Sequence, residues 1–176
     1  MTDYRGRSAI VLGLGTSGLS MARWLARHGA SVRVADTRAH PPQADRLAAE
    51  LPGVALETGP VTAATLAGAD LIAISPGVPK DQAAIEEAHA AGADLAGDVE
   101  LFARELPPAQ KVVAITGTNG KTTTTALTGE LARAAGLATS VAGNIGAAVL
   151  DVLASIEAGA PWPDLFVLEL SSYQLE

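Results

Sequence analysis

The chain has 176 residues, with 12 Lys and Arg against 19 Asp and Glu, which gives a formal net charge of −7. This acidic balance argues against a nucleic-acid-binding protein, which normally carries excess positive charge. Hydrophobic residues make up 48% of the chain, enough to offset the ordering entropy of a packed core, so intrinsic disorder is excluded. No stretch approaches the roughly 20 apolar residues of a membrane helix. Cysteine is absent, which excludes disulfides and thiolate metal sites, and we expect a cytoplasmic location.

Apolar runs of strand length alternate with Ala- and Leu-rich helical stretches in the first part of the chain. This alternation is typical of βαβ units in a parallel sheet that is covered on both faces. We expect strands at 8–13, 31–36, 54–58, 70–75 and 94–96. We expect helices at 18–28, 44–51, 62–67, 82–91 and 99–105. Residues 1–106 are therefore predicted to form an α/β domain with a Rossmann-like parallel sheet.

A second unit follows a stiff linker at 107–110, which contains Pro107 and Pro108. Its expected elements are a strand at 111–116, a helix at 121–135, a strand at 138–142, a helix at 147–155 and a strand at 165–170. Three strands are fewer than a doubly wound domain normally has. The chain is thus predicted to contain one complete domain and the beginning of a second α/β domain.

The glycine loop 13–18 (GLGTSG) fits the G-x-G-x-x-G pattern, follows an expected strand and opens an expected helix. In that context the helix N-terminus is aimed at a phosphate, and Asp36, at the end of the second strand, is placed to accept hydrogen bonds from a ribose. The pattern does not identify the base, because backbone amides and a helix dipole recognise only the phosphates. The alternative is a packing turn, with Asp36 as a helix cap. Residues 75–79 (SPGVP) either line the same crevice or form an ordinary turn.

A second phosphate loop, 117–122 (GTNGKT), follows the strand 111–116 and opens the next helix. Its backbone amides would form an anion nest, with Lys121 as a charge for the β and γ phosphates and the Thr122 hydroxyl as a Mg²⁺ ligand. The loop departs from the strict G-x-x-x-x-G-K-[ST] pattern because Ile115 stands at the first glycine position. We therefore predict a shortened nucleoside-triphosphate loop, which makes 111–176 the beginning of a P-loop ATPase-type α/β domain.

Two polar residues stand at the ends of the neighbouring strands. Glu169 ends a hydrophobic strand and is either a Mg²⁺ ligand or a solvated strand terminus. Asn144, in the segment 143–146, either hydrogen-bonds a substrate or makes a turn.

Taken together, these segments resemble the Mur ligase family, over almost the whole chain. The resemblance is carried by the segments 13–20 (GLGTSGLS), 36–38 (DTR), 75–77 (SPG), 97–102 (GDVELF), 115–122 (ITGTNGKT), 143–146 (GNIG) and 169–176 (ELSSYQLE). The loop 115–122 is common to the wider superfamily. The first domain together with 169–176 resembles the D-glutamate-adding branch of the family.

The resemblance implies an ATP-dependent, amide-forming ligase of peptidoglycan precursor synthesis, with ATP and Mg²⁺ as cofactors. The γ-phosphate of ATP would pass to the carboxylate of UDP-N-acetylmuramoyl-L-alanine, and the amine of D-glutamate would attack the resulting acyl phosphate. The family's second-metal histidine, carbamylated lysine and C-terminal domain would lie beyond residue 176. We therefore expect a fragment that binds substrate without turnover.

The resemblance also assigns individual residues. Contacts to the UDP substrate are expected from Leu14, Gly15, Thr16, Ser17, Asp36, Thr37, Arg38, Ser75, Gly77, Asn144, Ser171 and Gln174. ATP contacts are expected from Gly117, Thr118, Asn119, Gly120, Lys121, Thr122 and Thr123. Lys121 and Glu169 would be the catalytic residues, and Thr122 and Glu169 the metal ligands.

Two other functions stay open on the residues alone. An NAD(P)-binding oxidoreductase domain would explain the first glycine loop and Asp36 but not the second phosphate loop. A non-catalytic nucleotide-binding module would fit the short length, but it would not need Lys121, Thr122 and Glu169 together.

Overall fold

The computed structural model describes residues 2–174. The chain divides into two compact units, Met1–Leu101 and Phe102–Glu176. The division falls within helix α5 (Asp98–Glu105), shortly before the linker expected at 107–110, and that linker stays a prediction.

The first unit is an α/β unit built around a five-stranded parallel sheet. Its strands are β1 (Ser8–Leu12), β2 (Ser31–Asp36), β3 (Ala55–Thr58), β4 (Leu71–Ile74) and β5 (Asp94–Gly97). Its helices are α1 (Thr16–Arg27), α2 (Ala44–Glu50), α3 (Ala63–Leu66) and α4 (Ala83–Ala90), with α5 at its end. The strand order β3-β2-β1-β4-β5 is that of a Rossmann-like sheet, which confirms the predicted fold class.

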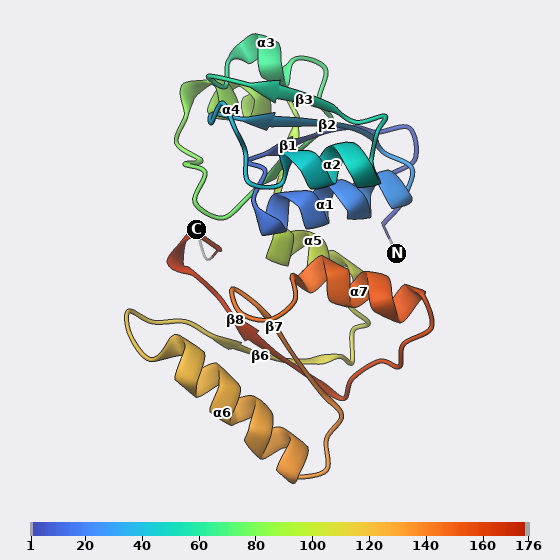
Figure 1. The fold of residues 1–176 in the computed structure, drawn as a ribbon, viewed down its shortest axis with the longest axis vertical. Helices are drawn as coiled ribbons and strands as arrows, with labels where there is room; N and C mark the ends of the chain where they lie inside the picture. Colours follow the sequence, from blue (N-terminus) through green and yellow to red (C-terminus); the bar gives the residue numbers. More distant parts are fainter. Residues whose placement is uncertain (1, 175–176) are drawn as a thin grey trace. The chain divides into compact units, whose positions relative to one another are not determined.

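The centre of this sheet is buried because its strands are almost wholly apolar. Ile10 and Leu12 of β1 belong to one core cluster with Ile72 of β4, and this cluster includes Leu66 of α3 and Ile85 of α4. Helix α1 packs against β1, β2 and β4. Figure 1 shows α1 and α2 on one side of the sheet and α3 and α4 on the other. Strands buried on both faces lose the apolar–polar alternation and keep a continuous hydrophobic run.

Successive strands are added first on one side of β1 and then on the other, so the strand order changes side between β1 and β4. Strands β2 and β3 extend the sheet from one side of β1, and β4 and β5 extend it from the other. Such a switch point opens a crevice at the carboxyl ends of the strands, where ligands of parallel sheets bind. The loops after β1 and β4 flank this crevice.

The second unit contains a three-stranded parallel sheet in the order β6-β8-β7. Its elements are β6 (Lys111–Ile115), α6 (Lys121–Ala134), β7 (Thr139–Gly143), α7 (Val149–Glu157), β8 (Leu165–Glu169) and the 3₁₀ helix η1 (Ser172–Gln174). Helices α6 and α7 lie on opposite sides of this sheet (Figure 1). The three predicted strands are confirmed, and η1 was not expected from the sequence.

Two helix starts differ from the prediction by two residues. Helix α1 begins at Thr16, inside the glycine motif, rather than at Gly18, so the second half of the motif is already helical. Helix α7 begins at Val149 rather than at Ala147, because the backbone at Ala147 is still extended and its carbonyl accepts the Gly143 N–H at 3.1 Å. Within residues 2–174 no helix combines the length and apolar character needed to cross a membrane.

Candidate functional site

The first glycine loop is held tightly against the loop that follows β4. Gly13 follows the last residue of β1 with a φ of +85°, a conformation that favours glycine, and its carbonyl accepts a hydrogen bond of 2.6 Å from the buried Ser75 hydroxyl. A Cβ at Gly18 would overlap the Gly13 carbonyl oxygen, so α1 can approach β1 this closely only with glycine at that position. The third glycine therefore has the packing role that the motif predicts.

A cavity of about 290 Å³ opens beside this loop at the carboxyl ends of β1 and β2. Four of the expected UDP-substrate contacts line it: Asp36, Thr37, Arg38 and Gly77. The loop Pro76–Pro79 lines it as well, as the crevice interpretation of residues 75–79 predicts, whereas Ser75 does not. Val61 and Gln82 also line the cavity and were missed, because neither belongs to a motif.

The Asp36 carboxylate is the most buried charge of this cavity, with 2% of the residue exposed. Arg38 pairs with it through Nη2–Oδ2 at 2.6 Å and Nε–Oδ1 at 2.8 Å. The backbone N–H groups of Leu14 and Arg38 donate to the same carboxylate at 2.6 and 2.8 Å. These donors, with the Arg38 side chain first, lower the pKa of Asp36 from 3.8 to about 2. Asp36 thus joins β2 to the glycine loop, and the alternative role as a helix cap is wrong.

Five expected contacts of the first unit do not line the cavity. They are Leu14, Gly15, Thr16, Ser17 and Ser75. Leu14 and Ser75 serve the loop instead, through the Leu14 N–H to Asp36 and the Ser75 hydroxyl to Gly13. Gly15 and Ser17 are partly buried and Thr16 is exposed, at the N-terminus of α1. Unpaired amides of a first helical turn attract phosphates, so a contact from these three stays a prediction.

The second phosphate loop lies between β6 and α6, as the sequence predicts. Gly117 and Gly120 have φ angles of +147° and +75°, and Gly120 is the N-cap of α6. The Lys121 ammonium turns back over the loop and donates to the Gly117 carbonyl at 2.6 Å. Thr118, Asn119, Thr122 and Thr123 are exposed. The first turn of α6 therefore faces solvent with its amides and hydroxyls, an arrangement suited to phosphate groups.

Glu169 lies next to this loop through strand pairing. It pairs with Ile115 of β6 and with Gly143 of β7, so the carboxyl ends of all three strands meet at its position. Only 2% of Glu169 is exposed, so its interpretation as a solvated strand terminus is wrong. Oε1 accepts the Asn144 side-chain amide at 3.0 Å, whereas Oε2 is buried and has no hydrogen-bond partner.

A buried carboxylate oxygen without a partner fits a cation ligand, because leaving such an oxygen unpaired is costly. Residues 2–174 hold no cluster of three or more His, Cys, Asp or Glu side chains suited to a metal ion. Mg²⁺ would therefore depend on Glu169, on the Thr122 hydroxyl and on phosphate oxygens, the donor set that Mg²⁺ commonly uses.

The remaining expected contacts lie just after β8 and β7. The Gln174 side-chain oxygen accepts both the N–H and the hydroxyl of Ser171, at 2.9 and 3.2 Å. Asn144 is held by Glu169 through its side chain and also through its N–H, which donates to the Glu169 carbonyl at 2.9 Å. The structure thus groups Asn144 with Glu169, and Ser171 with Gln174. The last two residues of the segment 169–176 lie outside the described residues.

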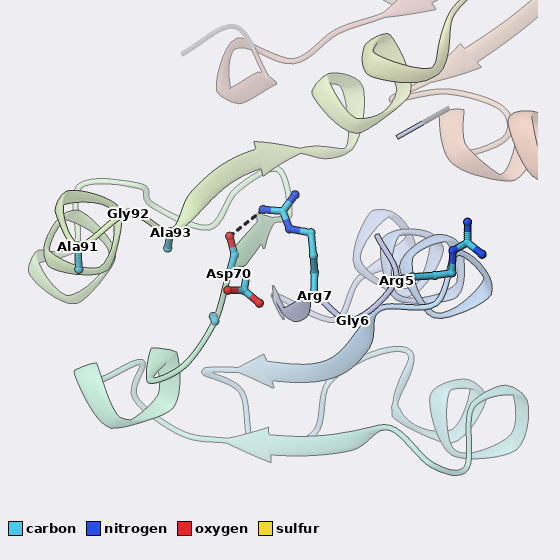
Figure 2. A pocket seen from close by; sticks show the side chains of 8 residues that line it. Arg5, Gly6, Arg7, Asp70, Ala91, Gly92 and Ala93 are labelled. Atoms are coloured by element: carbon cyan, nitrogen blue, oxygen red, sulfur yellow. Dashed lines mark hydrogen bonds between the residues drawn. The ribbon is translucent and has the colours of Figure 1, made fainter. Parts of the chain in front are cut away.

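A larger cavity of about 450 Å³ lies at the opposite edge of the first sheet, near the amino ends of β1, β4 and β5. Figure 2 shows Arg7 turned toward Asp70, whose carbonyl it bonds at 3.0 Å, and Arg5 extending away. Arg7 also pairs with Asp94 at 3.6 Å. The Arg7 guanidinium therefore already has hydrogen-bond and ion-pair partners within the chain. In addition, ligands of parallel sheets bind at the carboxyl ends of the strands, and this cavity lies at their amino ends. The smaller cavity at the carboxyl edge is the candidate site.

Comparisons with known proteins agree with this geometry. Residues 7–97 match the family model "Mur ligase MurD-like, N-terminal domain" and residues 115–176 match "Mur ligase middle domain". A relative from Thiobacillus denitrificans, named UDP-N-acetylmuramoylalanine--D-glutamate ligase, is 55% identical over 97% of this chain and 39% of its own length. A relative of the same name from Chromobacterium violaceum is 52% identical over 99% of this chain and 39% of its own length.

Solved structures support the same fold. A pseudomurein peptide ligase type C from Methanothermus fervidus superimposes with a TM-score of 0.50 at 28% identity, over 95% of this chain and 33% of that one. A UDP-N-acetylmuramate:L-alanyl-gamma-D-glutamyl-meso-diaminopimelate ligase from Neisseria meningitides gives a TM-score of 0.56 at 22% identity, over 93% and 52%. The chain spans about two fifths of the length of the curated relatives named above. Because the N-terminal family model alone covers more than half of its residues, the chain belongs to the Mur ligase family, in the MurD-like branch.

Proposed function

We propose that the chain is the substrate-binding part of an ATP-dependent ligase that adds D-glutamate to UDP-N-acetylmuramoyl-L-alanine in the cytoplasm. The observation that carries the proposal is the presence of two phosphate loops, each at the carboxyl edge of its own parallel sheet. The names of the two relatives supply the substrates. A nicotinamide-dependent oxidoreductase would leave the second loop without a role.

The cavity beside Asp36 would take the uridine diphosphate group. Thr37, Arg38 and Gly77 line it, and their hydroxyl, guanidinium and backbone amide would be donors suited to a uracil, a ribose and phosphates. The N-terminus of α1, with Gly15, Thr16 and Ser17, would add backbone amides for the diphosphate. Leu14 and Ser75 would contribute by holding the loop in shape.

The loop 117–123 would hold the triphosphate of ATP. Its carbonyl bond to Lys121 would be exchanged for a phosphate contact, since a charge-assisted bond to phosphate is stronger than one to a neutral carbonyl. Thr122 and Glu169 would hold Mg²⁺, which when bound would offset the charge of the transferring phosphoryl group. Asn144 would orient Glu169, and Ser171 with Gln174 would face the muramoyl end of the substrate.

The chemistry explains why ATP is needed. A carboxylate is a poor acyl donor, so the terminal carboxylate of UDP-N-acetylmuramoyl-L-alanine must first become an acyl phosphate. The amine of D-glutamate then attacks the carbonyl carbon and phosphate leaves. On this chain Lys121 and Glu169 would serve the phosphoryl transfer, by charge and by metal ligation.

The test is a calorimetric titration of this chain with UDP-N-acetylmuramoyl-L-alanine, with NAD⁺ and NADP⁺ as parallel ligands. Saturable binding of the UDP compound alone is the expected result. Binding of a nicotinamide dinucleotide in its place would contradict the proposal. A second titration with Mg²⁺ and ATP should show binding that Lys121→Ala weakens at least tenfold, while affinity for the UDP compound stays the same.

A further inference from the structure

Asp36 stands where dinucleotide-binding sheets carry the acidic residue that recognises an adenosine ribose. It ends β2, next to the glycine loop, and it lines the candidate cavity. In such proteins the carboxylate accepts hydrogen bonds from ribose hydroxyls, which requires acceptor positions that the protein itself leaves free. The motif and the acidic residue alone would therefore predict an NAD-binding site.

The acceptor positions of Asp36 are taken by the chain. Oδ1 accepts the N–H and the Nε–H of Arg38, both at 2.8 Å. Oδ2 accepts the Leu14 N–H and Arg38 Nη2, both at 2.6 Å. A carboxylate has about four lone-pair positions, so these bonds saturate it.

This arrangement resists displacement by a ribose. The guanidinium bonds both carboxylate oxygens, and such fork-shaped, charge-assisted pairs are stronger than bonds to neutral hydroxyls. A ribose would also have to displace the Arg38 side chain from a carboxylate that is 2% exposed, and a buried charge that loses its partner carries a large penalty. The Arg38 side chain itself is 51% exposed, so its outer part remains accessible to a ligand in the cavity.

We propose that Arg38 is a specificity-determining residue that excludes NAD⁺ from this Rossmann-like unit by saturating Asp36. The bonds to Asp36 use Nε and Nη2 and do not involve Nη1, which can serve other acceptors, such as uracil or phosphate oxygens. The choice between nucleotides thus depends on one arginine two residues after the ribose-type aspartate. This inference deepens the proposed function and rests on it for the identity of the accepted ligand.

The experiment removes the guanidinium and measures NAD⁺ binding directly. In Arg38→Ala, Asp36 regains two acceptor positions, and we expect NAD⁺ affinity to rise about tenfold or more, because bonds to a charged acceptor are among the stronger ones. Affinity for UDP-N-acetylmuramoyl-L-alanine should fall in the same variant. Arg46→Ala is the matched control, since it removes an arginine of the same unit from an exposed pair with Glu50, and it should change neither affinity.

Two further variants keep the result decisive. Arg38→Met retains side-chain length without donors and should gain NAD⁺ binding even where Arg38→Ala folds poorly. Adding Asp36→Asn to Arg38→Ala should abolish the gain, because an amide offers one acceptor oxygen instead of two. Unchanged NAD⁺ affinity in folded Arg38→Ala and Arg38→Met would overturn the inference. A gain of NAD⁺ binding in a chain whose wild type ignores the UDP compound would refute the proposed ligand and leave the role of Arg38 standing.

Discussion

At the residue scale, two glycines of the first loop differ in the space around them. A Cβ at Gly18 would overlap the Gly13 carbonyl oxygen, whereas a Cβ at Gly15 would meet no atom within 4 Å. Gly15 also has a φ of −92°, which any residue can adopt. We expect Gly18→Ala to lower the free energy of unfolding by about 3 kcal/mol, because overpacking forces the backbone apart.

Chemical denaturation measures this difference, and Gly15→Ala is the control. Its free energy of unfolding should stay within about 1 kcal/mol of the wild type. If both variants lose the same free energy of unfolding, the overlap with the Gly13 carbonyl is not the reason that the loop requires glycine at position 18.

The buried Asp36 predicts a specific pH dependence. Its pKa is lowered from 3.8 to about 2, chiefly by the Arg38 side chain. A carboxylate with a lowered folded-state pKa stabilises the fold above its unfolded pKa, and this contribution is lost as the pH falls through the folded value. Stability should therefore fall between about pH 4 and pH 2, by an amount on the order of 1–2 kcal/mol after allowance for the half-exposed Arg38.

Denaturation of the wild type and of Asp36→Asn at several pH values tests this. The asparagine variant should be less stable at pH 6 and should lack this part of the acid dependence. If both proteins lose stability in parallel between pH 4 and pH 2, the ion pair with Arg38 does not hold in solution.

Individual residues also differ in how well the sequence predicted them. Lys121 and Glu169 could be placed from motif and strand position alone, because a parallel strand brings its last residue to the ligand edge. The saturation of Asp36 could not be predicted, since it depends on how Arg38 folds back and on the Leu14 N–H from another strand end. Val61 and Gln82 gave no signal, because only the assembled loops bring them to the cavity.

At the scale of elements, the turn after β4 acts as a support for the first glycine loop. The Ser75 N–H donates to the Leu12 carbonyl at 2.9 Å and its hydroxyl donates to the Gly13 carbonyl at 2.6 Å. The turn then closes on itself through the Val78 N–H and the Ser75 carbonyl. This turn is therefore a structural partner of the loop in addition to a wall of the cavity.

We expect Ser75→Ala to lower the free energy of unfolding by about 1–2 kcal/mol, since it leaves a buried carbonyl with one bond fewer. Affinity for the UDP compound should fall in parallel, because the loop loses its support. Ser155→Ala is the control, as the Ser155 hydroxyl makes a similar bond to the Asp151 carbonyl on an exposed helix surface. If the two variants lose the same free energy of unfolding, the hydrogen bond from Ser75 to the Gly13 carbonyl stabilises the fold no more than an exposed helix bond does.

Element boundaries show where sequence patterns lose accuracy. The strands were predicted to within a residue or so at each end, because continuous apolar runs end where the sheet ends. The start of α1 was placed too late, at Gly18, since glycine and hydroxyl residues resemble a loop in sequence. The Leu19 N–H donates to the Gly15 carbonyl at 3.0 Å, and this bond closes the first turn of the helix at Thr16.

At the scale of the whole molecule, the two units differ in how much of their sheet is covered. In the first unit β1 lies between β2 and β4 and is buried throughout except at Ser8. In the second unit β6 is an edge strand, and Val112 and Val113 are each 39% exposed. Helix α6 likewise exposes Leu127 and Leu131, at 57% and 62%. Less buried apolar area implies lower local stability for the second unit.

Hydrogen exchange followed by mass spectrometry should reveal this difference. We expect the hydrogen-bonded amides of β6 to exchange at least about tenfold faster than those of β1, because opening the less covered sheet costs less free energy. The central strand β8 serves as the internal reference, since it pairs on both sides. Equal protection of β1 and β6 would show that exposure does not limit the stability of the second sheet.

Local patterns of apolar, glycine and charged residues were enough to predict the α/β class, the succession of strands and helices along the chain and both strand–glycine loop–helix motifs, and these motifs carried the resemblance to the Mur ligase family. The predicted contacts that share a cavity, the saturation of Asp36 by Arg38 and Leu14, and the burial of Glu169 with one oxygen unpaired became visible only in the folded chain. Hydrogen-bond saturation and burial depend on groups far apart in the chain, whose positions no local pattern contains.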